Sequence, residues 1–178
     1  YVDMKKSYKE FLHQINTFVF DIDGVFTDGT VLVTQEGHLL RSVSVRDGLA
    51  VKLALEAGYH VCLISGGTNP GIVTRFEALG VTDIYMGATH KIEPYQTYTQ
   101  KIGVENHQVL YMGDDLPDLP VMDLVGLSTC PQNAIPEVKM SADYVSPFLG
   151  GQGCVRDVIE QVMKVNGHWP VVAKANND

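Results

Sequence analysis

Two carboxylates, Asp21 and Asp23, directly follow a short apolar run and precede a glycine turn. The run, Thr17 to Phe20, is too short for a helix and is typical of a strand buried on both faces of a parallel sheet. Ligands bind outside the carboxyl ends of such strands, so both acids would face a substrate. Adjacent carboxylates repel each other unless a cation lies between them, and hard oxygen ligands favour Mg²⁺. This stretch therefore predicts a magnesium site.

Three further groups of polar residues follow in the chain. Ser65 and Gly66 end a second apolar run and open a glycine-rich turn whose amides could bind an anion, Lys91 opens a later helical stretch, and Gly-Asp-Asp-Leu-Pro-Asp follows a third run at 113–118. Taken singly, an Asp-x-Asp pair is more typical of a solvated turn, Ser65 of a loop hydrogen bond and Lys91 of a surface lysine. Because parallel strands bring their ends to one edge of a sheet, we expect these residues to form one site.

Size and charge restrict the partners. With 178 residues, 45% hydrophobic and 19% charged, the chain is expected to form a single domain over 1–178 with a core at about 17–165. The net charge of -8 argues against binding to nucleic acid or to an anionic membrane, because both need a basic surface. An anionic substrate would depend on a metal ion and on a few of the 13 Lys and Arg residues.

The three cysteines show no metal-binding or redox spacing, which favours a reducing compartment. No apolar run approaches the roughly 18 residues of a membrane span, and no signal-peptide pattern opens the chain. We therefore expect a cytoplasmic protein that does not act at a membrane.

Strand and helix signals alternate with short links. This alternation predicts an α/β fold, a three-layer sandwich with a mainly parallel, Rossmann-like sheet. Within it, Asp47 is expected to cap a helix through about Ala57 with Leu49, Leu53 and Ala57 turned inward, and Asn69 to cap the helix that Pro70 opens. The predicted strands are 17–20, 59–64, 83–86, 108–112, a short one near 126–127 and 143–145, and the last amphipathic helix runs from Val155 to Val162.

An insertion at about 30–45 interrupts the alternation. Two strand-like runs, 30–34 and 39–45, flank the loop Gln-Glu-Gly-His, which predicts a β-hairpin. Its apolar residues occur on more than one face, so the hairpin would pack either against another molecule or back onto its own domain. The sequence leaves both alternatives open.

The order of the motifs resembles that of the haloacid dehalogenase superfamily of phosphotransferases, from about residue 17 to about 160. The resemblance implies that Asp21 is the nucleophile and a metal ligand. It implies that Asp23 is the general acid and base, with its backbone carbonyl on the metal. Asp114 would complete the protein ligands, and Asp115 or Asp118 would support them. Ser65, Gly66 and Lys91 would bind the phosphoryl group.

Superfamily members often carry a cap domain over the site, but this chain has room only for the hairpin between Asp23 and Asp47. It is therefore most similar to the cap-less 3-deoxy-D-manno-octulosonate 8-phosphate phosphatases. The residues that carry this similarity are 21–29, 45–49, 113–115 and 150–153 with Arg156.

The resemblance to this family implies a set of contacts to an acidic sugar. Lys52 takes the place of a further basic position, and Gly67 departs from the arginine that often follows the Ser/Thr-Gly pair. The resemblance also implies a homotetramer built through the hairpins, with the glycine loop 150–153 serving an adjacent subunit. The residues implied to bind the sugar acid are Ser44, Val45, Arg46, Asp47, Gly48, Lys52 and Arg75.

These observations lead to one expected function with two alternatives. We expect a Mg²⁺-dependent phosphatase that hydrolyses 3-deoxy-D-manno-octulosonate 8-phosphate in lipopolysaccharide precursor synthesis. The alternatives are a phosphatase of a nine-carbon ulosonate 9-phosphate and a catalytically silent phosphate-binding or structural subunit. The joint presence of Asp21, Asp23, Lys91 and Asp114 argues against silence, because a silent copy has no chemical need for all four.

Overall fold

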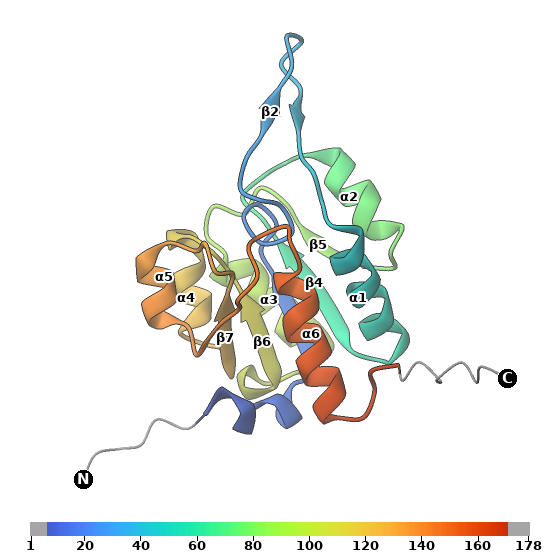
Figure 1. The fold of residues 1–178 in the computed structure, drawn as a ribbon, viewed down its shortest axis with the longest axis vertical. Helices are drawn as coiled ribbons and strands as arrows, with labels where there is room; N and C mark the ends of the chain where they lie inside the picture. Colours follow the sequence, from blue (N-terminus) through green and yellow to red (C-terminus); the bar gives the residue numbers. More distant parts are fainter. Residues whose placement is uncertain (1–6, 171–178) are drawn as a thin grey trace, which may run out of the picture.

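A computed structural model describes residues 7–170 of the chain, and the remaining part of the expected 1–178 domain lies outside the described residues. Six strands form one sheet in the order β5-β4-β1-β6-β7-β8, and every neighbouring pair is parallel (Figure 1). The strands are β1 Thr17–Phe20, β4 His60–Ile64, β5 Asp83–Tyr85, β6 Val109–Met112, β7 Leu127–Cys130 and β8 Tyr144–Val145.

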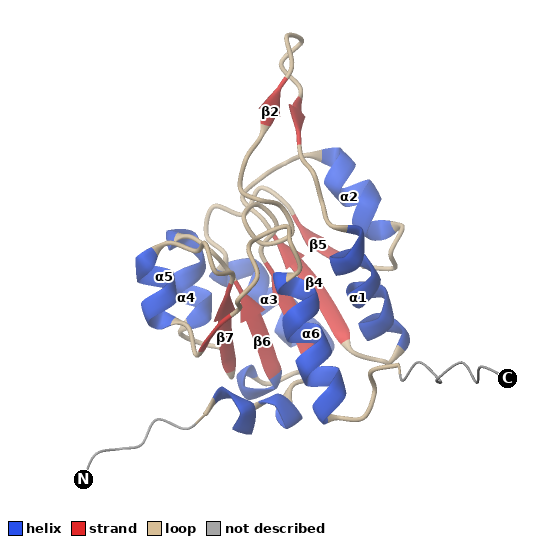
Figure 2. Ribbon diagram, viewed as in Figure 1, coloured by secondary structure: helices blue, strands red, loops and turns tan. Residues whose placement is uncertain are grey.

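Helices cover both faces of this sheet (Figure 2). One layer holds α1 Val45–Glu56, α2 Pro70–Glu77 and α6 Cys154–Val165, and the other holds α3 Ile92–Ile102, α4 Leu119–Met122 and α5 Pro136–Ser141. The predicted three-layer α/β sandwich is confirmed, and the described sheet is entirely parallel. No helix in the described residues is both long and apolar enough to cross a membrane.

The central strand β1 shows why the sheet needs two helix layers. Phe18 and Phe20 lie in the core beneath α1, α2 and α6, whereas Val19 lies in the opposite core with Tyr95 and Tyr111. Successive strand residues point to opposite faces, so a strand between two cores is apolar throughout. All four residues of β1 are buried, and the chain stays buried through Asp21 and Ile22, so the first carboxylate of the motif lies inside the protein rather than on its surface.

Helix α1 differs from the prediction in its start and in its buried face. Its N-cap is Ser44, whose side chain accepts a hydrogen bond from the Asp47 amide, so the prediction of Asp47 as the cap is wrong. The buried apolar residues are Ala50, Val51 and Ala54, and of the predicted set only Leu53 packs, partly buried, against the core. Of that set, Leu49 is 48% exposed and Ala57 is also exposed.

Asp47 does not cap its own helix because its carboxylate binds the first turn of another helix. Its buried carboxylate accepts hydrogen bonds from the amides of Arg156, at 2.8 Å, and Gly153, at 3.2 Å. These amides open helix α6, whose first turn has no acceptors of its own for them. Asp47 therefore caps α6 from α1, a contact that no local pattern could indicate. The cap of α2, in contrast, is Asn69 with Pro70 at the first position, as predicted.

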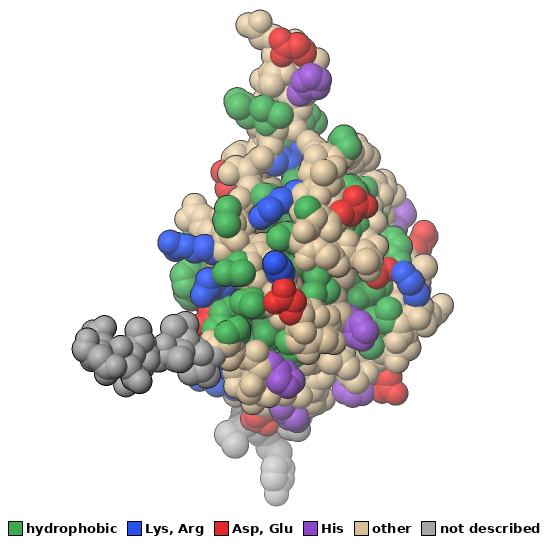
Figure 3. Space-filling view, turned by 90° about the vertical axis from the view of Figure 1, so that its right-hand side faces the viewer, with side chains coloured by type: hydrophobic (Ala, Val, Ile, Leu, Met, Phe, Trp, Pro, Cys, Tyr) green, Lys and Arg blue, Asp and Glu red, His purple; other side chains and the backbone are tan. Residues whose placement is uncertain are grey.

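The hairpin consists of β2 Leu32–Val33 and β3 Leu39–Leu40, which are shorter than predicted. It projects from the carboxyl edge of the sheet, and apolar side chains lie along its surface (Figures 1 and 3). Leu32 is 68% exposed, Val33 62% and Leu40 49%. Its strands are therefore not buried against their own domain.

Replacing Asp47 by Ala is expected to lower the free energy of unfolding by about 1–3 kcal/mol, because two amides in the α6 first turn would lose their acceptor. Asp47→Asn should cost less, since its side-chain oxygen can still accept one of these bonds. Urea denaturation at neutral pH measures both changes. The exposed Asp123 provides the control, as Asp123→Ala should leave the midpoint unchanged. An unchanged midpoint for Asp47→Ala would contradict the cross-helix cap.

Candidate active site

The predicted catalytic and metal residues lie together at the carboxyl edge of the sheet. Asp21 follows β1, Ser65 follows β4 and Asp114 follows β6, and these three strands are adjacent in the order β4-β1-β6. The loops enclose a hollow of about 390 Å³. Its lining includes Asp21, Asp23, Ser65, Gly66, Gly67, Lys91, Asp114, Asp115 and Asp118.

The glycine turn after β1 makes room for Asp114. Gly24 has a φ of +90°, and a Cβ at this position would lie 1.9 Å from the Asp114 carboxylate. Thr27 holds the turn, because its hydroxyl oxygen accepts hydrogen bonds from the Gly24 and Gly29 amides at 3.1 and 3.2 Å. Only glycine combines this backbone conformation with such a close approach.

Lys91 lies between two carboxylates at the bottom of the hollow. Its Nζ is 2.8 Å from Asp21 Oδ1 and 2.6 Å from Asp118 Oδ1, and its side chain is 5% exposed. Burial by itself lowers the pKa of Lys91, but the charges of Asp21 and Asp118 and their hydrogen bonds outweigh it, so that the pKa is raised. Lys91 is therefore a charged group in the site.

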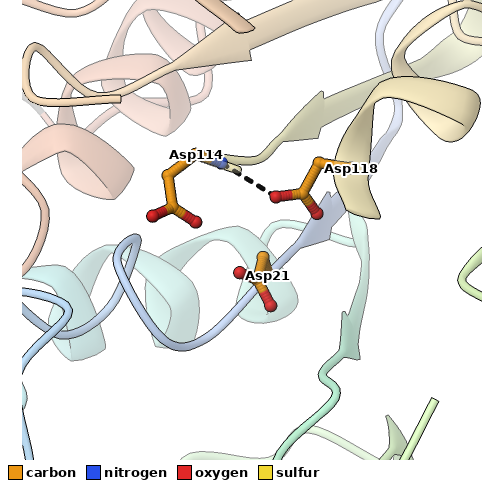
Figure 4. A group of neighbouring side chains, drawn as sticks. All are labelled: Asp21, Asp114 and Asp118. Carbon is orange, nitrogen blue, oxygen red and sulfur yellow. Dashed lines mark hydrogen bonds between the residues drawn. The ribbon is translucent and has the colours of Figure 1, made fainter. Parts of the chain in front are cut away.

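Asp118 organises this part of the site from η4, Leu116–Asp118. Its Oδ1 accepts from Lys91 and from the buried Tyr111 hydroxyl, at 2.6 and 2.5 Å. Its Oδ2 accepts from the Asp114 amide at 2.9 Å (Figure 4) and from the Asp115 amide at 3.2 Å. A carboxylate has about four acceptor positions, so those of Asp118 are filled. The exposed Asp115 carboxylate accepts from the Leu116 amide instead.

The remaining carboxylates are suited to a divalent cation. Oxygen atoms of Asp21, Asp114 and Asp118 lie within 4.8 Å of one another, and the carboxylates face a common space (Figure 4). Among the described residues, the buried Asp114 Oδ1 has no hydrogen-bond partner. Since Asp118 is saturated, Asp21 and Asp114 are the side chains with capacity to ligate a metal ion.

The pKa values of Asp21 and Asp114 also favour a bound cation. Burial, with the negative charges of Asp21 and Asp118, raises the pKa of Asp114 to about 8. Burial and the charge of Asp118 likewise raise the pKa of Asp21 to about 6, against the opposing effect of Lys91. Both acids therefore need further positive charge to remain ionised together, and Mg²⁺ with its preference for oxygen ligands fits that need.

The turn after β4 presents polar groups to the same hollow. The Ser65 side chain is buried, and its hydroxyl oxygen accepts a hydrogen bond from the Gly67 amide at 3.1 Å. The Ser65 carbonyl accepts from Ala88 and the Gly67 carbonyl from Gly87, both at 2.9 Å, so two loops fix the turn. The Ser65 hydroxyl can still donate, which suits it to an oxygen of an anion.

Asp23 has a partner that sequence reasoning missed. Arg41, just after β3, contacts it through Nε to Oδ1 at 2.6 Å and Nη2 to Oδ2 at 3.3 Å. A Cβ at Gly67 would lie 3.7 Å from Arg41 Nη2, so the guanidinium stands next to the position where the family arginine is absent. The available signal was a single cation in an apolar hairpin strand close to an acidic motif.

The residues expected to bind the sugar acid do not line the catalytic hollow. Ser44, Val45 and Arg46 instead line a second hollow of about 890 Å³, together with Gly153 and Arg156 among others. Of the remaining four, Asp47 and Gly48 are buried in α1, and Arg75 lies against Gly48, where an added Cβ would be 3.1 Å from its Nη2. Lys52 is exposed and 3.9 Å from Glu56.

A parallel sheet with a buried Asp–Lys pair and an acidic cluster at its carboxyl edge defines a hydrolase of the haloacid dehalogenase type. Consistent with this class, the family model described as haloacid dehalogenase-like hydrolase matches residues 73–153. The chain is also 35% identical to the 3-deoxy-D-manno-octulosonate 8-phosphate phosphatase of Escherichia coli K12, over 86% of this chain and 81% of that protein. The chain therefore belongs to this phosphatase family.

Solved structures agree with the assignment. The phosphatase of the same name from Yersinia pestis superposes with a TM-score of 0.89 at 31% identity, covering 90% of this chain and 87% of that chain. The phosphatase from Moraxella catarrhalis, solved with magnesium, phosphate and 3-deoxy-D-manno-octulosonate (KDO), superposes with a TM-score of 0.85 at 29% identity. That match covers 88% of this chain and 90% of that chain.

Titration of Asp21 and Asp114 should make the stability of the metal-free protein depend on pH, and Mg²⁺ should counteract that dependence. In EDTA, the raised pKa values of Asp21 and Asp114 contribute stability below their ordinary values near 4, and this contribution is lost as the pH rises through about 6 to 8. Mg²⁺ should offset the loss, so thermal denaturation should show a larger Mg²⁺-induced increase in Tm at about pH 8 than at about pH 5. Asp114→Asn should abolish the difference. An equal increase at both pH values would contradict the proposed ligands.

Proposed function

We propose that this protein is a Mg²⁺-dependent phosphatase that converts 3-deoxy-D-manno-octulosonate 8-phosphate to the free sugar acid and phosphate. The observation that carries the proposal is the buried Asp21, held 2.8 Å from Lys91 beside the unpartnered oxygen of Asp114. The family relation gives the substrate, since relatives bear this name and one was solved with KDO, phosphate and magnesium.

The proposed reaction has two displacements. An Asp21 oxygen attacks phosphorus, the bond from phosphorus to the sugar oxygen breaks, and Asp23 gives that oxygen a proton. Water then attacks the aspartyl-phosphate while Asp23 takes a proton from it, which releases phosphate and restores Asp21. The half-exposed position of Asp23 at the rim of the hollow supports this role, because both the leaving group and water can reach it there.

The other residues bind and orient the phosphoryl group. Lys91 neutralises one oxygen, and the Ser65 hydroxyl and Gly66 amide donate to another. Asp118 holds Lys91 and the 114–115 amides in place. Mg²⁺, when held by Asp21, Asp114 and the Asp23 carbonyl, would screen the Asp21 carboxylate from the negative phosphate.

The identity of the sugar acid in the substrate is a separate element of the proposal. The nine-carbon ulosonate 9-phosphate stays as the second candidate because of Gly67, which lacks the side chain that would otherwise stand beside Asp23 and Ser65. The silent alternative is disfavoured by the assembled site, in which Asp21, Lys91 and Asp114 meet. We place the reaction in lipopolysaccharide precursor synthesis, and in the cytoplasm, which suits three buried, unpaired cysteines.

We further propose a homotetramer that forms through the hairpins. The exposed apolar side chains of β2 and β3 support it, since contiguous apolar surface marks interfaces. Residues Ser44–Arg46 and, from the glycine loop 150–153, Gln152 and Gly153 line the second hollow, outside the catalytic one. We propose that they contact the sugar acid bound at an adjacent subunit's catalytic hollow, with Arg75 and Lys52 nearby as further cations.

Phosphate release from a panel of acidic and neutral sugar phosphates tests the function. We expect the 8-phosphate of 3-deoxy-D-manno-octulosonate to give the highest kcat/KM, EDTA to stop turnover and Mg²⁺ to restore it. Asp21→Asn should lose at least about 10³-fold in kcat, because the amide cannot attack phosphorus, while its circular dichroism stays that of the wild type. Turnover by Asp21→Asn near the wild-type rate would exclude the aspartyl-phosphate route. A higher kcat/KM for the nine-carbon ulosonate 9-phosphate would show that this compound, and not the eight-carbon one, is the preferred substrate.

Sedimentation tests the assembly. Leu32 and Leu40 are opposite each other in the hairpin, so a Leu32→Lys/Leu40→Lys variant should dissociate the oligomer and raise KM for the sugar phosphate. Glu36→Gln at the hairpin tip is the matched control and should sediment as the wild type does. A wild-type protein that is monomeric and fully active at assay concentration would contradict the proposal.

A further inference from the structure

Arg41 is the hairpin residue that reaches the catalytic hollow through another side chain. Its Nε lies 2.6 Å from Asp23 Oδ1, and its Nη2 lies 3.3 Å from Asp23 Oδ2. The Arg41 side chain is only 10% exposed, whereas that of Asp23 is 40% exposed. Such two-point guanidinium–carboxylate contacts fix orientation as well as charge, and a lysine cannot reproduce them.

The guanidinium is itself fixed to the base of the hairpin. Arg41 Nη1 donates to the Leu39 carbonyl at 3.3 Å, and the same carbonyl accepts from Asn69 Nδ2 at 2.7 Å. Asn69 is the N-cap of α2, so the base of the hairpin is tied to a rigid helix. Arg41 thereby connects Asp23 in the β1 turn with β3 and with α2.

The space next to the Arg41–Asp23 ion pair is open because residue 67 is a glycine. A Cβ there would lie 3.1 Å from Asp23 Oδ2 and 3.7 Å from Arg41 Nη2. The first distance is tighter than ordinary van der Waals contact. Gly67 therefore leaves the space in which the Arg41–Asp23 pair is formed.

We infer that Arg41 is a positioning residue that aims the Asp23 carboxylate at the oxygen of the leaving group. The inference rests on the proposed function, in which Asp23 protonates that oxygen. A half-exposed aspartate without a fixed partner can adopt several rotamers, and misplacement of a catalytic group by about 1 Å can cost about 10²-fold in rate. Through Arg41, the geometry of the hairpin base determines where the proton is delivered.

The leaving group distinguishes this role from binding of the phosphoryl group. An alkyl phosphate releases a strongly basic oxygen that needs a proton, whereas p-nitrophenyl phosphate releases a stable phenolate that does not. Arg41→Gln should therefore lower kcat/KM for a sugar phosphate by about 10- to 100-fold and for p-nitrophenyl phosphate by less than about threefold. Arg41→Lys should recover only part of the loss. Inhibition by inorganic phosphate should change by less than about twofold.

A double-mutant cycle with Asp23 tests whether Arg41 acts through this side chain. In an Asp23→Asn background, Arg41→Gln should add no further loss on the sugar phosphate, because the group that it positions is no longer an acid. Lys101→Gln is the matched control, since it also removes one cation from an ion pair, with Asp83 at the start of β5, and should leave the kinetics unchanged.

Three results would overturn the inference: equal losses on both leaving groups, a weaker inhibition by phosphate that accounts for the whole loss, or full additivity with Asp23→Asn. Failure of the proposed substrate is recognised separately. A wild-type enzyme that hydrolyses simple sugar phosphates but not the ulosonate phosphates would exclude that substrate, and the Arg41 comparison would then be made on those simple sugar phosphates.

Discussion

The ion pairs of Lys91 with Asp21 and Asp118 are the contact on which the rest of the site depends. They join the turn after β1, the start of α3 and η4 in a region where the Lys91 side chain is 5% exposed. A buried charge is tolerated only when it is paired and hydrogen-bonded. Tyr111 and the amides of residues 114–115 supply the remaining bonds to Asp118, so the network fixes the position of the Asp21 carboxylate before any ligand is present.

This network also explains how an acidic protein can accept an anionic substrate. The chain carries a net charge of -8, yet positive groups stand where phosphate would bind: Lys91 in the hollow, Arg41 behind Asp23, and the backbone amides of the 65–67 turn. The pKa values of Asp21 and Asp114 are raised, first by burial and then by the neighbouring carboxylates, although Lys91 opposes the shift. A divalent ion is the missing charge, and it also supplies attraction for the phosphoryl group.

The sequence predicted those features that depend on local pattern and on parallel topology. Asp21, Ser65 and Asp114 were each expected after a strand, and parallel strands could only bring them to one edge. The Asn69–Pro70 helix start is similarly local. The buried face of α1 was mispredicted because it is made of small residues such as Ala50 and Ala54, while the larger Leu49 is exposed.

Contacts between distant segments explain the remaining errors. Asp47 looks like a cap for its own helix, but its carboxylate binds amides more than 100 positions away in α6. Arg41 and Asp23 are 18 positions apart in the sequence. They meet because the chain between them folds into a hairpin whose base is hydrogen-bonded to Asn69. Such pairings are set by how elements pack, and propensity and periodicity contain no information on them.

In the described residues, no cap domain lies between Asp23 and α1, so the hairpin is the only insertion there, and two of its features bear on the site. Its outer strands present apolar side chains to the outside, and its base places Arg41 on Asp23. A partner that packs on β2 and β3 would therefore restrict the same short segment that holds the Asp23 carboxylate through Arg41. In the proposed tetramer, closure by a partner and alignment of Asp23 would then depend on one element, because Arg41 directly follows β3 and its guanidinium donates to the Leu39 carbonyl of that strand.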